Sequence, residues 1–153
     1  MSKQSDKYHL SLAGEYFVAA ELQRRNVSAA VTYGNAKKAD VVAFNDAGDK
    51  VTVIEVKTTG QRQWVLGGRT PEPSDKIWVL VHVPEDASQS PSYYVLTQTE
   101  IHDVLAPLDA VYRRKYLAKH GVEYGDRTGV CNFSLKQAED HRDAWHKIVE
   151  RLR

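Results

Sequence analysis

The sequence lacks several features that would place it in a specialised class of protein. It has a single cysteine, Cys131, among its 153 residues, which excludes an internal disulfide and fits a reducing compartment. No apolar run is long enough to cross a bilayer, and the first residues lack the apolar stretch of a secretory signal. We therefore expect a cytoplasmic protein without a membrane partner.

The chain also lacks a large excess of either charge. Its formal net charge is +1, with 27% charged and 42% hydrophobic residues. This balance argues against a protein that coats nucleic acid through a strong basic field, but not against a nuclease, whose active site must itself be acidic. The length and composition predict one soluble globular domain over residues 1–153, with residues 1–7 frayed.

Several sequence motifs of catalysis and metal binding are missing as well. There is no glycine-rich phosphate loop and no nucleophile elbow. His141 and His146 are five residues apart, so on a helix they would point to different sides, and no zinc motif surrounds them. The sequence therefore gives no support to a nucleotide triphosphatase, a serine hydrolase or a zinc protein.

What is present is a predicted hairpin with charges where apolar residues are expected. Residues 39–44 and 51–59 are rich in β-branched side chains, and the turn between them carries Asn, Asp and Gly. Asp40 opens the first strand. Glu55 and Lys57 lie within the second and, because strand side chains alternate, share one face. Ionised groups on such a strand need a partner or a metal ion.

These residues resemble the D…(D/E)-x-K signature of the PD-(D/E)XK nuclease superfamily. The order of Leu12-Ala-Gly-Glu15 on a predicted helix, Asp40, and Glu55-Val56-Lys57 is similar to its small bacterial endonuclease and archaeal Holliday-junction-resolvase branches. The resemblance covers roughly residues 12–59, and Ala39 stands where the signature has proline. It implies an α/β restriction-endonuclease-like fold, with a mixed β-sheet flanked by helices.

The same resemblance implies a metal-dependent endonuclease that hydrolyses DNA phosphodiester bonds, with Glu15, Asp40, Glu55 and Lys57 as its catalytic residues. We expect Asp40 and Glu55 to bind Mg²⁺ or Mn²⁺, because carboxylate oxygens are hard ligands. The resemblance adds the backbone carbonyl of Val56 as a ligand. Glu15 is expected to hold a second ion or a metal-bound water, or else to be a charge at the start of a helix. Lys57 is expected to position the attacking water and stabilise the transition state.

Candidate nucleic-acid contacts are basic, hydroxyl or aromatic residues that flank these strands or lie on a basic helix. They are Lys37, Lys38, Thr58, Thr59, Arg62, Trp64, Arg69, Arg113 and Arg114. For the lysines and the helix arginines, the alternative is a solvated surface. For Trp64, the alternative is packing against the core.

Hydrophobic periodicity and turn signals predict the remaining elements. The expected order is a helix over residues 9–25, a strand over 27–33, the hairpin, a loop over 60–75, a central strand over 76–83, a strand over 92–97, a helix capped by Thr97 and Glu100 and ending at Pro107, a helix over 109–120, a short strand over 130–133, and a helix over 138–152.

Two other functions remain compatible with the sequence. The first is a catalytically inactive module on the same fold that binds nucleic acid or protein, and the second is a nuclease that acts on RNA. The filled positions at Glu15, Asp40, Glu55 and Lys57 favour an enzyme over an inactive module, and they do not separate DNA from RNA as the substrate. A domain this small that cut both DNA strands would act as a homodimer.

Overall fold

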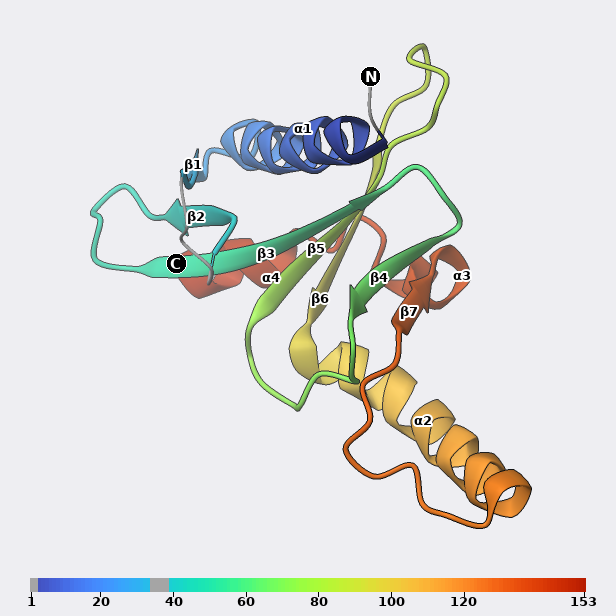
Figure 1. Ribbon diagram of the computed structural model, residues 1–153. Coiled ribbons are helices and arrows are strands. Elements are labelled where there is room, and N and C mark those ends of the chain that lie inside the picture. The colour runs from blue at the N-terminus through green and yellow to red at the C-terminus, as the bar shows by residue number, and fades with distance from the viewer. Residues whose placement is uncertain (1–2, 34–38) are drawn as a thin grey trace.

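The computed structural model describes residues 3–33 and 39–153, and within them the protein is an α/β structure with one five-stranded and one two-stranded sheet (Figure 1). The elements in order are α1 (Lys3–Gln23), β1 (Ser28–Val31), β2 (Val41–Phe44), β3 (Val51–Thr59), β4 (Gln63–Gly67), β5 (Ile77–His82), β6 (Ser92–Thr97), α2 (Gln98–His120), β7 (Cys131–Ser134), α3 (Leu135–Ala138), the 3-10 turn Glu139–His141, α4 (His146–Val149) and the 3-10 turn Glu150–Leu152. None of the described helices is both long and apolar enough to cross a membrane.

The larger sheet is mixed and has the strand order β1-β2-β3-β5-β6. β1, β2 and β3 are antiparallel neighbours, β3 and β5 run parallel, and β5 pairs antiparallel with β6. Parallel neighbours need a long connection, and β4 with the segment after it supplies this connection. The mixed sheet predicted from the sequence is confirmed, and β3 is the strand that joins its antiparallel and parallel parts.

The two faces of this sheet are covered by different parts of the chain. On the first face, Val18 and Leu22 of α1 pack with Trp145 and Ile148 near the C-terminus. On the second face, the β4–β7 sheet and the first turns of α2 form a separate core cluster. β5 is buried except at its last residue, as its continuous apolar run predicts.

Three helix predictions differ from the structure. α1 begins at Lys3, so residues 3–7 are helical rather than frayed. Pro107 lies inside α2 and does not end it; its ring removes one backbone donor, but α2 continues to His120. The predicted helix over residues 138–152 is broken into short pieces, and Asp143 between them has a φ of 50°.

The segment over residues 60–75, predicted to be a loop, contains β4. Its residues alternate, with Trp64 and Leu66 buried and Val65 exposed, as in a strand with one face on the core. β4 pairs antiparallel with β7, which lies far along the sequence. The loop prediction was wrong because the neighbouring glycines and prolines hide a short alternation that only distant pairing stabilises.

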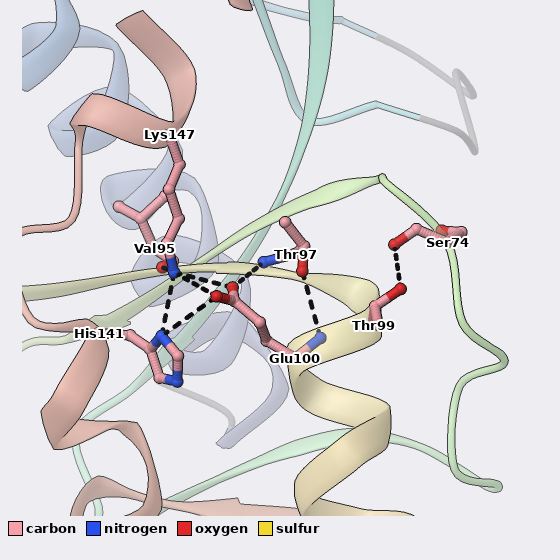
Figure 2. Close-up of polar contacts among 7 residues, drawn as sticks. All are labelled: Ser74, Val95, Thr97, Thr99, Glu100, His141 and Lys147. Carbon is pink, nitrogen blue, oxygen red and sulfur yellow. Dashed lines mark hydrogen bonds and ion pairs between the residues drawn. The ribbon is translucent and has the colours of Figure 1, made fainter. Parts of the chain in front are cut away.

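A cluster of polar contacts fixes the start of α2 to the C-terminal part of the chain (Figure 2). The predicted capping box is confirmed, since Thr97 accepts from the Glu100 backbone and its own N–H donates to Glu100 Oε2 at 2.8 Å. Lys147 Nζ donates to both Glu100 oxygens and to the backbone carbonyl of Val95 at 3.0 Å. Burial opposes ionisation of Glu100, but Lys147 and the Thr97 N–H hold its pKa below the ordinary value.

Candidate functional site

Glu55 and Lys57 project from the second face of the sheet, as the alternation of β3 predicts. The register pairs Glu55 with Trp78 and Lys57 with Leu80, and both partners belong to the core cluster on that face. The distance from Lys57 Nζ to Glu55 Oε1 is 3.5 Å. The E-x-K residues therefore form an ion pair that is partly exposed at the middle of β3.

Asp40 is bonded to the two residues that flank Glu55. It lies just before β2, and its backbone N–H donates to the carbonyl of Ile54 at 3.0 Å. Its side-chain Oδ2 accepts the N–H of Val56 at 2.8 Å. A carboxylate therefore satisfies a backbone donor of β3, which fixes Asp40 beside the E-x-K residues.

Lys76 is a residue of this site that the sequence analysis missed. Its Nζ is hydrogen-bonded to Glu55 Oε2, while Lys57 faces Oε1, so both oxygens of Glu55 have an ammonium partner. Lys76 directly precedes β5, whose Ile77 pairs with Ile54. The parallel pairing of β3 and β5 brings Lys76 to Glu55, and the sequence gives no signal for that pairing apart from the two apolar runs.

Glu15 approaches from the helical side of the sheet. It lies in the interior of α1 rather than in its first turn, which contradicts the alternative of a helix-start charge. Burial raises the pKa of Glu15 above its ordinary value, and the nearby charge of Asp40 raises it further. The structure therefore brings Glu15 toward Asp40, while Glu55 is paired with Lys57 and Lys76.

The preceding residue, Gly14, explains how α1 comes so close to β3. A Cβ atom added to Gly14 would lie 1.8 Å from Oγ1 and 2.9 Å from Cβ of Thr58. Thr58 pairs with Val81, on the face opposite Lys57. Only a glycine at residue 14 allows this packing, and this role was not recognised in the sequence.

The donor types at the site fit a hard divalent cation, because Glu15, Asp40 and Glu55 offer carboxylate oxygens and Val56 offers a backbone carbonyl. The positions of these donors, however, do not form a ready-made metal site. Across residues 3–33 and 39–153, no three His, Cys, Asp or Glu side chains are grouped so that they could hold a metal ion. Glu55 would have to exchange Lys76 for the cation.

A groove of about 810 Å³ lies beside Lys57. Its lining includes Lys7 and Ser11 of α1, the predicted contacts Thr58 and Thr59 of β3, and Gln61 and Gln63. Trp64 also borders the groove, but it is only 1% exposed and its Nε1 donates to the carbonyl of Val81 at 2.9 Å. The core-packing alternative for Trp64 therefore agrees with the structure.

The other predicted nucleic-acid contacts do not gather at this groove. Arg69 and Arg113 line a second cavity, at the outer part of α2. Arg62 and Arg114 are exposed, and neither is among the residues that line the groove. Lys37 and Lys38 lie outside the described residues.

Comparison with known proteins adds no relative to this description. Neither a model of a protein family nor a curated protein sequence matches the chain. The resemblance to the nuclease superfamily therefore stays a prediction from the residues between Leu12 and Thr59.

Proposed function

We propose that this protein is a metal-dependent endonuclease that hydrolyses DNA phosphodiester bonds, on a restriction-endonuclease-like fold. The observation that carries the proposal is the bond from the Val56 N–H to the Asp40 carboxylate. It ties the aspartate that directly precedes β2 to the middle residue of E-x-K on β3. A purely structural acid at a strand end has no need to lie beside two further charged residues.

In this proposal Asp40 and Glu55 hold Mg²⁺ or Mn²⁺, with the Val56 carbonyl as a further ligand and Glu15 nearby. The cation, when bound, supplies charge neutralisation at the phosphate and an activated water. Lys57 lines the groove and donates to a phosphoryl oxygen, where its charge stabilises the transition state. Lys7 and Ser11 are placed to contact the backbone of a strand in the same groove.

The competing proposal is an inactive binding module, and one observation favours it. Glu55 is already neutralised by Lys57 and Lys76 in an arrangement that requires no metal ion. If that network is the working state of the protein, the groove would bind nucleic acid without cutting it.

Two measurements separate these proposals. Incubation with linear, supercoiled, single-stranded and four-way-junction DNA, with Mg²⁺, Mn²⁺ or EDTA, should show cleavage that depends on the metal. Calorimetry with Mn²⁺ should show binding that is lost in Asp40→Ala and Glu55→Ala. Binding to DNA without cleavage of any form would favour the module, and cleavage of RNA alone would favour the RNA nuclease.

Lys76 offers a sharper version of the calorimetric test. Because Lys76 and the cation compete for Glu55, Lys76→Ala should tighten Mn²⁺ binding several-fold, on the order of 1 kcal/mol for one removed competing charge near the surface. Lys50→Ala, at an exposed lysine on the turn before β3, is the matched control. Unchanged affinity in Lys76→Ala would remove Glu55 from the metal site.

A further inference from the structure

A second cavity, of about 320 Å³, lies between the outer part of α2 and the segment that leads into β7. Its lining includes the arginines Arg69, Arg113 and Arg127 and the tyrosines Tyr112 and Tyr124. Among the described residues that line it, Asp109 is the one carboxylate. The cavity therefore combines an excess of positive charge with aromatic surface.

The protein holds each of these arginines in place. Arg113 donates from Nε to Asp109 Oδ2 at 2.8 Å and from Nη1 to the carbonyl of Gly125 at 2.9 Å. Arg127 donates from Nη1 to two backbone carbonyls of the same loop, both at 2.8 Å. Arg69 donates from Nη2 to a further carbonyl of that loop. Their orientations are thus fixed before any ligand binds, which lowers the entropic cost of binding.

These bonds leave guanidinium donors uncommitted. A guanidinium group has five N–H donors. Within the described part of the chain, no hydrogen-bond partner is found for Nη2 of Arg113, Nε and Nη2 of Arg127, or Nε and Nη1 of Arg69. Pairs of such donors match the oxygens of a phosphate group.

The tyrosines add a surface for a planar group. Tyr112 is 54% exposed, and its ring meets the Tyr124 ring edge to face at 5.4 Å. The guanidinium of Arg113 lies 5.1 Å from the centre of the Tyr124 ring. Exposed tyrosine faces stack with nucleic-acid bases. The cavity volume is near the lower limit of about 300 Å³ for ligand pockets, which favours a small ligand.

We propose that this cavity binds a nucleoside phosphate, with its phosphate on Arg69, Arg113 and Arg127 and its base against Tyr112. The site uses none of the β3 residues and goes beyond the proposed nuclease activity. A free nucleotide and the terminal nucleotide of a nucleic-acid strand share this chemistry. If the arginines served only to fasten the loop to α2, no such ligand would bind.

Calorimetry in EDTA at fixed low salt tests the proposal without any cleavage reaction, so it is independent of the nuclease proposal. The probes are adenosine 5′-monophosphate, adenosine, inorganic phosphate, and an oligonucleotide with or without a 5′ phosphate. We expect the monophosphate to bind more tightly than adenosine or phosphate alone. Tighter binding of the 5′-phosphorylated oligonucleotide than of the monophosphate would identify a strand end as the source, and weaker binding would identify a free nucleotide.

Arg69→Gln and Arg127→Gln should each weaken monophosphate binding at least about tenfold, as expected for lost hydrogen bonds to a charged group. Arg24→Gln, at an exposed arginine directly after α1 that does not line the cavity, is the matched control. Tyr112→Ala leaves the hydrogen bonds between the arginines and the loop intact. It should weaken binding of the monophosphate but not binding of inorganic phosphate. Absence of binding at millimolar monophosphate, or equal binding by an Arg69→Gln/Arg127→Gln double variant that melts like the wild type, would overturn the proposal.

Discussion

The charged residues around β3 and the arginines of the second cavity, which lies at the outer part of α2 and is called the outer cavity below, differ in their hydrogen-bond partners. On β3, the Glu55 carboxylate is paired with the ammonium groups of both Lys57 and Lys76. At the cavity, Arg127 and Arg69 are bonded to neutral carbonyl groups. Charges on a core strand must be compensated locally. Carbonyl groups orient Arg69 and Arg127 without removing their charge, whereas Arg113 is paired with Asp109, so an incoming anion meets less competition at Arg69 and Arg127 than at β3.

The largest effect should come from removing the ammonium group of Lys57. Lys57→Ala leaves both carboxylates in place, so metal binding should survive, while turnover should fall on the order of 10²-fold or more through loss of a transition-state donor. Lys57→Arg should restore little activity, because a planar fork does not replace a compact charge. Single-turnover cleavage measured beside a gel-shift titration separates turnover from DNA binding.

Lys50→Ala is the control for this experiment, and nucleoside-phosphate binding at the outer cavity should be unchanged in both variants. If the wild type cuts DNA and Lys57→Ala cuts it equally well, the E-x-K residues are not catalytic. The two regions would then differ in how their charges are bonded, and the difference would have no catalytic meaning.

The next largest effect should be on stability, at the contact between α1 and β3. Gly14→Ala places a methyl group into Thr58 and should cost about 1–3 kcal/mol in the free energy of unfolding. Gly60→Ala is a control, because its added Cβ would lie 3.4 Å from the nearest atom. Urea denaturation gives both values, and adding Thr58→Ala should rescue part of the loss.

If Gly14→Ala proves as stable as the wild type, α1 does not lie as close to β3 as described. The approach of Glu15 to Asp40 would then lose its support. Ligand binding at the outer cavity should be retained by the folded fraction of Gly14→Ala, since none of the described residues that line the cavity belongs to α1.

Much of the β3 region could be predicted from the sequence, because its signals are local. The strand over residues 51–59 follows from its alternation. The cap of α2 at Thr97 and Glu100 is equally local and follows from a capping box. β4, the position of Lys76 and the outer cavity depend on pairing between distant segments. The loop before β7 brings Arg69 and Arg127 together. The residues next to each arginine in the sequence give no sign that the other arginine lies nearby.

A third prediction extends the comparison to the charge cluster at the start of α2. Lys147→Met should lower the free energy of unfolding by about 1–2 kcal/mol at neutral pH, through lost bonds to a carboxylate. Because the folded pKa of Glu100 lies below its ordinary value of 4.5, its stabilising effect is present above that pH and is lost as the pH falls below it.

The difference between Lys147→Met and wild type, measured by urea denaturation, should therefore shrink as the pH falls below 4.5. Lys136→Met, at an exposed lysine of α3, is the control. A difference that stays constant with pH would mean that Lys147 acts through packing and not through the charge of Glu100.

The smallest expected effect on stability is that of Glu15→Gln, which should reduce cleavage and slightly stabilise the fold. Burial and Asp40 raise the pKa of Glu15, so the ionised form destabilises the folded state as the pH rises above 4.5. The gain in melting temperature should therefore vanish below that pH. Glu150→Gln is an exposed control, and unchanged cleavage in Glu15→Gln would exclude a role for Glu15 at the site.

The C-terminal segment has a consequence for how this protein meets other copies of itself. Asp143 donates its N–H to the carbonyl of Tyr93, and Lys147 donates to that of Val95, so the outer carbonyls of β6 are taken. At the opposite edge, β1 is short and Gln23 covers the carbonyl of Ala29. Sheet edges with free carbonyl and N–H groups recruit strands from other molecules and lead to aggregation. At both edges of the five-stranded sheet, carbonyl groups are bonded by the chain's own side chains or backbone, which makes pairing with a second copy through these edges less favourable.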